Sequence, residues 1–239
     1  MKTPDWLTRT ELMIGKDGLK KLSKANVLIV GLGGVGGYAA EMICRAGVGK
    51  ITIVDSDVVQ ESNINRQIIA LQSTIGQDKT HLIGERMKDI NPALELTMIK
   101  GYMKDDFLIE VINHDEYDYV VDAIDTLSPK IYLIYHCMNK GYKVVSSMGA
   151  GGKLDPTMIR VGDISETNTC KFAFDIRKRL RKLGITEGFK AVYSPEVVAK
   201  ETILATDDKN KKSMVGTISY MPAVFGCACA SVVIRDLIN

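Results

Sequence analysis

A short apolar run at residues 27–30 leads directly into a glycine-rich segment and then into a stretch with helical periodicity. The run is Val-Leu-Ile-Val, without a polar residue, which is typical of a parallel strand buried on both faces. The sequence GLGGVGG follows at residues 31–37, and residues 38–42 have the apolar spacing of a helix. Strand, glycine turn and helix is the order in which a phosphate binds backbone amides at a helix N-terminus. The pattern therefore predicts a nucleotide site at this turn.

The alternation of strand and helix patterns continues along the chain. Further strands are expected at residues 50–54, 94–99, 117–123 and 143–147, and helices at 11–24, 79–90, 105–112 and 131–140. Such alternation is typical of a doubly wound, mostly parallel α/β sheet of the Rossmann-like kind, with right-handed crossovers. After residue 147 the pattern changes. The elements expected there are a glycine segment (148–153), a strand (158–161), a basic helix (169–184) and a closing apolar helix (222–238).

Length and composition indicate one globular domain. The 239 residues suit a single α/β core, and no break in composition divides them. We expect one domain over residues 1–239, in which residues 1–147 bind the nucleotide and residues 148–239 face the substrate. The net charge is only +2, so a nucleic-acid surface would have to be local. No apolar run approaches the about 20 residues that a membrane helix needs, and the N-terminal residues lack the apolar core of a signal peptide. These features predict a cytoplasmic protein without an integral membrane segment.

The five cysteines argue against a disulfide framework, because they are odd in number and scattered in a chain without a secretion signal. The sequence contains no CxxC pair, so a tetracysteine zinc site is not expected. Cys227 and Cys229 are two residues apart on an expected helix, about 200° around its axis, and we expect both to be small core residues. Cys170 is the one thiol outside an obvious apolar face.

The glycine motif alone leaves open which nucleotide binds. Gly31, Gly33 and Gly36 satisfy GxGxxG, and Asp55 ends the second expected strand, where a carboxylate can accept from ribose hydroxyls. These features also fit an NAD-binding module. Arg66 and Lys79 follow further along the chain. A triphosphate needs such cations from beyond the glycine turn more than a dinucleotide does, so the two residues favour ATP.

Five motifs follow one another in order. They are GxGGxG from Gly31, a strand that ends in DxD at Asp55, NxNRQ from Asn63, GxxK ending at Lys79, and DAxD ending at Asp125. Together they resemble the ubiquitin-activating-type adenylyltransferase superfamily, over most of the chain. The resemblance implies ATP, magnesium and adenylation of a carboxylate rather than hydride transfer. It also implies an adenylyltransferase-type extension after the Rossmann-like half.

The same resemblance assigns roles to individual residues. The cofactor-binding residues that it implies are Gly31, Gly33, Gly34, Gly36, Asp55, Asp57, Asn63, Arg66 and Lys79. The catalytic residues that it implies are Arg9, Arg66, Lys79 and Asp125, of which Asp125 would bind the magnesium. Arg9 lies ahead of the expected first helix. In the superfamily an arginine at this place reaches across a homodimer interface toward the partner's triphosphate.

Three further features narrow the resemblance: the lack of zinc cysteines, the basic helix, and the sequence AVYSPE at residues 191–196. With SSMGAGGKLDP at residues 146–156, they look like the family of tRNA threonylcarbamoyladenosine dehydratases. This resemblance implies that ATP adenylates the free carboxylate of the threonyl group, and that a nucleophile of the same side chain then closes a ring and expels AMP. It implies tRNA as the substrate, with a sulfur-relay protein as a further candidate partner. The alternative is an activator of a ubiquitin-like sulfur carrier, whose C-terminal carboxylate the same machinery would adenylate.

The expected basic helix separates these two functions. A tRNA presents many phosphates, whereas a carrier protein needs only a path for its C-terminal tail. Four cations are therefore expected to contribute to tRNA binding: Lys171, Arg177, Arg181 and Lys182. Arg177 and Arg181 are four residues apart and share a helix face, while Lys178 and Arg179 are expected to point away from it.

Overall fold

One mixed sheet carries the whole architecture. In the computed structural model, which describes residues 3–205 and 213–239, seven strands lie in the order β3-β2-β1-β4-β5-β7-β6. Their bounds are β1 Asn26–Val30, β2 Lys50–Asp55, β3 Glu95–Lys100, β4 Tyr119–Asp122, β5 Lys143–Ser147, β6 Arg160–Asp163 and β7 Lys190–Tyr193. Six strands run parallel and only the edge strand β6 is antiparallel, to β7. The predicted doubly wound, mostly parallel α/β fold is confirmed. β8 (Ile203–Ala205) and β9 (Ser213–Val215) form a separate two-stranded antiparallel sheet.

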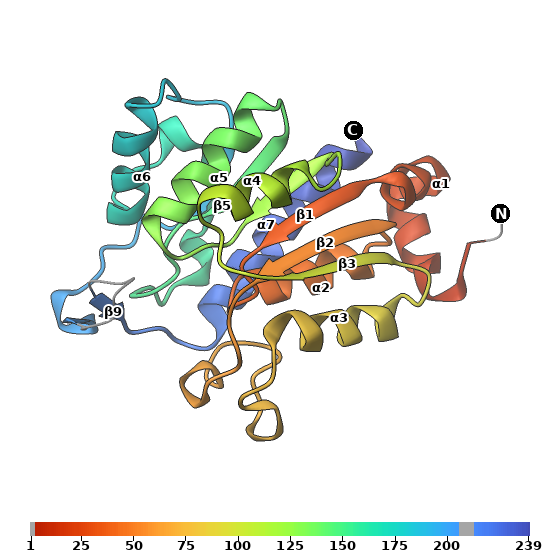
Figure 1. Cartoon of the computed structure of the whole chain (residues 1–239), viewed down its shortest axis with the longest axis horizontal. Coiled ribbons are helices and arrows are strands. Elements are labelled where there is room, and N and C mark those ends of the chain that lie inside the picture. The colour runs from red at the N-terminus through yellow and green to blue at the C-terminus, as the bar shows by residue number, and fades with distance from the viewer. Residues whose placement is uncertain (1–2, 206–212) are drawn as a thin grey trace.

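Helices cover both faces of the sheet (Figure 1). Their bounds are α1 Thr8–Lys24, α2 Gly36–Arg45, α3 Lys79–Ile90, α4 Asp105–Asn113, α5 Leu127–Asn139, α6 Lys171–Arg181 and α7 Tyr220–Ile238. Helices α1, α2, α3 and α7 share one hydrophobic core, and α4, α5 and α6 share the other. In β1, Val27 and Ile29 belong to the first core and Leu28 and Val30 to the second, because successive strand residues point to opposite faces. This double burial explains why the run at residues 27–30 is apolar at every position.

Helix α7 requires a correction to the sequence analysis. The stretch Tyr220–Ile238 is long and apolar enough, by length and composition alone, to cross a membrane, although no run of that length was expected. In the structure it packs against α1, α2 and β5. Phe225 and Val233 are fully buried in the first core. The apolar character of α7 is therefore accounted for by its place inside the fold.

The last turn of α7 is tied to the amino ends of two strands. Asp236 accepts hydrogen bonds from the Tyr119 hydroxyl at 2.8 Å and from Lys190 Nζ at 2.6 Å. Burial works to raise the pKa of Asp236, but the hydrogen bonds from Lys190 and Tyr119 outweigh it and hold that pKa below its usual value. These contacts fix the C-terminal helix on the sheet.

Several boundaries differ from the sequence prediction. The strand expected at residues 158–161 was misplaced, because Pro156–Met158 form a short 3-10 turn and the strand occupies Arg160–Asp163. The first helix begins at Thr8 rather than Glu11, and is kinked at Gly15, which has a φ of +74°. Arg9 therefore lies in the first turn of α1 and not ahead of it. The other expected strands and helices match their ranges within a few residues, whereas β7, β8 and β9 were not expected from the sequence.

Two expectations about cysteines were wrong. Cys170, expected outside an apolar face, is 6% exposed and packs in the second core together with Ala173 and Ile176 of α6. Cys227, expected in the core, is exposed, while Cys229 is buried. The two lie on different sides of α7, as their spacing requires.

Candidate nucleotide site and substrate face

The glycine turn folds tightly at the carboxyl end of β1. Gly31 has a φ of +87°, and a Cβ there would lie 2.9 Å from the carbonyl oxygen of Ala123. A Cβ on Gly36 would lie only 1.7 Å from the Gly31 carbonyl oxygen. The chain can therefore make this turn only with glycine at both positions. The turn leads into α2, so backbone amides are presented at a helix N-terminus beside the carboxyl edge of the sheet.

Asp55 and Lys79 bring the second strand and α3 to the same turn. The Asp55 carboxylate accepts from the Leu32 amide at 2.6 Å and from the Asp57 amide at 2.8 Å. Burial raises the pKa of Asp55, and the nearby Lys79 ammonium opposes this rise. Lys79 Nζ lies 2.9 Å from Asp57 Oδ2, with only 5% of the lysine side chain exposed. Three predicted site residues thus form one cluster around the glycine turn.

The loop between β2 and α3 places Arg66 against the other side of the turn. A Cβ on Gly34 would lie 3.3 Å from Cγ of Arg66, so the arginine stem packs on the glycine backbone. Burial lowers the pKa of Arg66, and the charge of Asp125 opposes this effect. Asn63 is buried, and its side-chain oxygen accepts from the Gln60 amide at 3.1 Å. Asn63 thereby shapes the loop that carries Arg66, and Arg66 and Asp125 are electrostatic neighbours.

Gln67 is a candidate that the sequence analysis missed. It is 8% exposed, and its Nε2 lies 3.5 Å from the place of a Cβ on Gly33. Its Oε1 is buried and has no hydrogen-bond partner among the described residues. The signal in the sequence is the last position of the NxNRQ motif, an uncharged residue directly after Arg66.

Asp125 follows β4, and a buried ion pair holds the turn beneath it. Lys130 Nζ lies 2.6 Å from Asp122 Oδ2, and both side chains are 0% exposed. The Ser146 hydroxyl also donates to Asp122 Oδ2, at 2.6 Å. Asp122 Oδ1 accepts from the Ile124 amide at 3.1 Å. Asp122 therefore caps the turn that follows β4. The helix expected at residues 131–140 left Lys130 outside it, whereas α5 begins at Leu127 and includes Lys130.

Arg9 lies at the opposite edge of the sheet from the glycine turn. Leu7 packs against Gly47, where an added Cβ would lie 3.1 Å from a Leu7 methyl group. Gly47 leads into the amino end of β2, whereas the glycine turn follows the carboxyl end of β1. Arg9 is exposed, as are Leu12 and Met13 on the same helix, at 84% and 85%. The structure does not bring Arg9 together with the other predicted site residues of its own chain.

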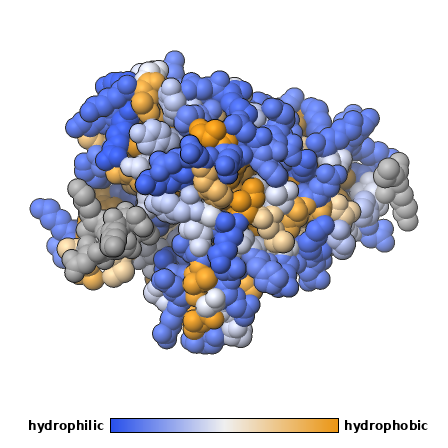
Figure 2. Space-filling view, viewed as in Figure 1, coloured by the Kyte–Doolittle hydropathy of each residue, from blue (hydrophilic) through white to orange (hydrophobic). Residues whose placement is uncertain are grey.

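The basic helix is confirmed as α6, at the upper left of Figure 1, where the surface is largely hydrophilic (Figure 2). Lys171 pairs with Asp175 at 2.9 Å. Arg177 is half-buried and donates to the Thr167 carbonyl oxygen at 2.7 Å. Arg181 and Lys182 are exposed. The four predicted cations are thus of two kinds, two engaged in local contacts and two open to solvent.

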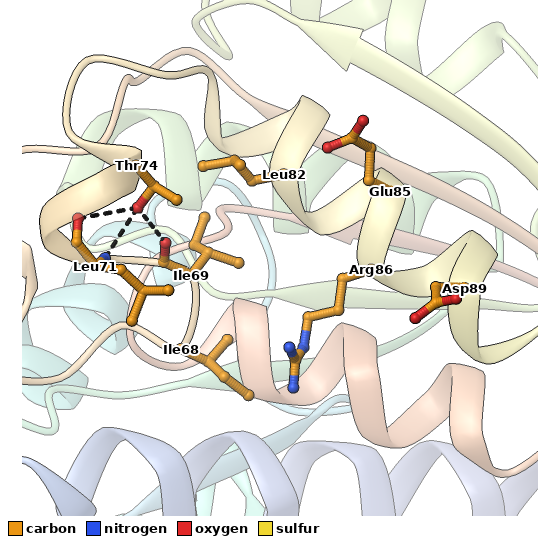
Figure 3. A pocket seen from close by; sticks show the side chains of 8 residues that line it. All are labelled: Ile68, Ile69, Leu71, Thr74, Leu82, Glu85, Arg86 and Asp89. Carbon is orange, nitrogen blue, oxygen red and sulfur yellow. Dashed lines mark hydrogen bonds between the residues drawn. The ribbon is translucent and has the colours of Figure 1, made fainter.

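A surface pocket beside α3 is distinct from the predicted site. Its lining residues are Ile68, Ile69, Leu71, Thr74, Leu82, Glu85, Arg86 and Asp89, none of them predicted to bind the nucleotide (Figure 3). The Thr74 hydroxyl donates to the Ile69 carbonyl oxygen at 2.7 Å and fixes the loop that forms one wall. Arg86 points away from this loop and pairs with Glu41 of α2.

A family model described as the ThiF family matches residues 7–239. The chain belongs to the ThiF family. This ThiF-family chain is 38% identical to the tRNA threonylcarbamoyladenosine dehydratase of Bacillus subtilis, over 97% of this chain and 94% of the relative. It superimposes with a TM-score of 0.89 and 31% identity on the crystal structure of the Escherichia coli tRNA N6-threonylcarbamoyladenosine dehydratase in complex with ATP, covering 100% and 97% of the two chains. An adenylyltransferase and sulfurtransferase of Zea mays is 35% identical, but over only 59% of this chain and 30% of the relative.

Proposed function

We propose that this protein is an ATP-dependent tRNA threonylcarbamoyladenosine dehydratase, which cyclises the modified adenosine through an acyl-adenylate. One observation carries the proposal: the likeness to the B. subtilis dehydratase extends over 97% of this chain and 94% of that protein. The match to the sulfurtransferase covers 59% of this chain, so the alternative, activation of a ubiquitin-like sulfur carrier, has weaker support. An NAD-binding function would not explain why Arg66 and Lys79 lie around the glycine turn, because a dinucleotide needs such cations less than a triphosphate does.

The family likeness implies a reaction in two steps, and the groups around the turn suit both. A carboxylate oxygen of the threonyl group attacks the α-phosphorus of ATP, and pyrophosphate leaves. A nucleophile of the same side chain then attacks the activated carbonyl, the ring closes, and AMP leaves with the oxygen that is lost overall as water. No protein nucleophile is needed, because the attacking group is already tethered to the carbonyl. The protein's task is to bind, orient and neutralise charge.

The cations and amides at the turn suit this task. Lys79 and Arg66 would neutralise charge that develops at the α-phosphate and on pyrophosphate, together with the amides after Gly34. Asp55, with Asp57 near it, would accept from the ribose hydroxyls. Asn63 would keep the Arg66 loop in place. Because Lys79 is held by Asp57 and Arg66 is packed on Gly34, these groups need little rearrangement when ATP binds.

The residues also fit magnesium. Mg²⁺ usually binds through one or two carboxylates plus substrate phosphates. Asp125 is exposed at the carboxyl edge of the sheet and interacts with Arg66. Within residues 3–205 and 213–239 no group of three or more His, Cys, Asp or Glu could hold a metal ion alone. Asp125 would therefore hold the ion together with ATP, and the bound ion would supply further neutralisation of the phosphates.

A homodimer is part of the proposal. Arg9 lies at the wrong edge of the sheet to reach its own glycine turn, so a second copy would have to bring it to the phosphates. The exposed Leu12 and Met13 are three and four residues after Arg9 and share its side of the helix, which suits an interface between two copies. The proposal also includes three expectations from the sequence. They are one domain over residues 1–239 with a nucleotide-binding half and a substrate-facing half, a cytoplasmic location, and a sulfur-relay protein as a partner.

The deciding experiment measures pyrophosphate release from ATP with two substrates. Purified protein is incubated with tRNA that carries threonylcarbamoyladenosine, with the same tRNA lacking the modification, and with a ubiquitin-like sulfur carrier. We expect release only with the modified tRNA, together with loss of one water mass from the modified nucleoside. Release with the carrier protein alone would replace the proposed function by the alternative.

A further inference from the structure

A groove between α5 and α6 begins close to the predicted reactive site. Its lining residues are Ser128, Ile131, Tyr132, Arg179, Lys182 and Leu183. Helices α5 and α6 pack side by side, at the upper left of Figure 1. Ser128 is three residues after Asp125 and lies in the first turn of α5. Tyr132 is four residues further, one helical turn or about 6 Å along the axis. The groove therefore extends outward from the turn that carries Asp125.

The groove combines an open aromatic ring with positive charge. Tyr132 is 52% exposed and Leu183 is 38% exposed, above a floor that includes the buried Ile131. Arg179 and Lys182 are three residues apart on α6 and present both cations to the same side. Arg179 lines this groove, whereas Arg177 is directed to Thr167 and does not line it. A half-exposed tyrosine beside two cations is not explained by the packing of the core.

Unpaired RNA bases are the ligands that such a combination suits. Proteins bind single-stranded RNA by stacking bases on aromatic rings or on arginine planes, with lysine and arginine on the phosphates. We propose that this groove binds an unpaired nucleobase next to the reacting nucleotide of the tRNA, with the base on the Tyr132 ring and its phosphate near Arg179 and Lys182. The inference rests on the proposed function, which places a modified RNA nucleotide at the adjoining site. The charge of the groove and its start beside Asp125 favour RNA over a carrier protein.

The first test measures binding of a tRNA stem-loop that carries the modified adenosine to the whole protein, by fluorescence titration. A fluorescent adenine analogue replaces each loop base beside the modified position in turn. Tyr132→Leu removes the ring but keeps an apolar side chain, and should weaken binding about 5- to 150-fold, the effect of losing one base stack. Tyr132→Phe should bind as the wild type does. Tyr102→Leu, at a tyrosine that is 42% exposed outside the groove, is the matched control and should also bind normally.

The second test separates stacking from charge. Replacing Arg179 and Lys182 together with methionine should lower the slope of log affinity against log salt by about 1.4, for two phosphates of a single strand. Tyr132→Leu should leave that slope unchanged. In all variants ATP binding, measured by calorimetry, should match the wild type. An unchanged RNA affinity of Tyr132→Leu, or an equal loss in Tyr102→Leu, would overturn the groove assignment.

Failure of the groove and failure of the proposed function give different results. If the wild type releases pyrophosphate with modified tRNA but Tyr132→Leu binds the stem-loop normally, only the groove assignment is wrong. If the wild type activates a carrier protein and Tyr132→Leu abolishes carrier binding instead, the proposed function fails and the groove is a protein-docking surface.

Discussion

The buried ion pair between Lys130 and Asp122 gives a prediction whose size follows from the structure. Lys130→Met keeps the length of the side chain and removes its charge, which leaves the Asp122 carboxylate without its cation. Both side chains are 0% exposed and 2.6 Å apart. Removing one partner of a fully buried pair costs about 3–5 kcal/mol, because the remaining charge is uncompensated. A domain of this kind is stable by about 5–15 kcal/mol, so the variant should lose a large part of its stability.

Two double variants separate charge from turn geometry. In Asp122→Leu with Lys130→Met the pair becomes apolar, and such replacements are often neutral or stabilising. The Ile124 amide then loses its acceptor, which costs about 1–3 kcal/mol. In Asp122→Asn with Lys130→Met the charge is also gone, but the amide oxygen can still accept from Ile124. We therefore expect both double variants to recover stability relative to Lys130→Met, and the Asn form to recover more.

The assay combines urea unfolding with adenylation. Unfolding free energies come from urea titrations at neutral pH, and pyrophosphate release reports adenylation. Because Ile124 lies in the turn that presents Asp125, the Leu double variant should adenylate more slowly than the Asn double variant at temperatures where both are folded.

Lys190→Met is the control, since the side chains of Lys190 and Asp236 are 45% and 21% exposed and their ion pair should be worth about 1 kcal/mol or less. A loss below about 1 kcal/mol in Lys130→Met would refute the reasoning on a buried charge. Equal adenylation by the two double variants would refute the role of the turn.

Four further predictions concern the predicted site and its surroundings. Lys79→Ala and Asp125→Ala should stay folded but lose adenylation about a hundredfold or more, as on removal of a preorganised electrostatic group; normal pyrophosphate release by both would show that the site is misplaced. Mixing Arg9→Ala and Lys79→Ala chains should restore some activity, because a hybrid dimer contains one site with both residues intact. A fully active protein that is monomeric by light scattering would exclude a role of Arg9 in the partner's site. Charge reversal of the four predicted cations in and after α6 should weaken tRNA binding and flatten its salt dependence, while ATP binding measured by calorimetry stays intact. An unchanged tRNA affinity would contradict this prediction. Because the pKa of Asp236 is lowered in the folded protein, its contribution to stability is present above about pH 4, the unfolded pKa, and is lost as pH falls through the folded pKa. Between neutral and acid pH, Asp236→Asn should therefore lose less unfolding free energy than the wild type, as measured by urea titration. Equal losses in the two proteins would contradict the assignment.

Local patterns in the sequence predicted most of the sheet, for a physical reason. The run at residues 27–30 is buried on both faces and apolar at every position, so β1 could be identified without knowledge of its neighbours. Glycine at positions 31 and 36 is required by the backbone of the turn itself. The edge strand β6 was misplaced because its partner β7 lies almost 30 residues further along the chain, and pairing at that distance leaves little trace in the local pattern.

The residues that the sequence did not reveal depend on contacts between distant segments. Lys130 is one lysine among many until β4, β5 and α5 bring it against Asp122 and Ser146. The groove at Tyr132 exists only because α6 packs against α5, and helical spacing on α6 alone could not say which cations would face it. Periodicity predicts the buried side of an element, but its neighbour on that side is decided by topology.

Helix α5 links the candidate nucleotide site to the proposed RNA groove through its first two turns. Its inner side carries Lys130, whose ion pair sets the turn before the helix, and its outer side carries Tyr132 in the groove. Lys130 Nζ also lies 6.0 Å from the ring centre of Phe172, in the first turn of α6. A change that displaces the start of α5 would therefore move Asp125 and the groove together. This arrangement would keep the carboxylate of a bound nucleotide at a fixed distance from the α-phosphate, which is the condition for a tethered substrate to react quickly.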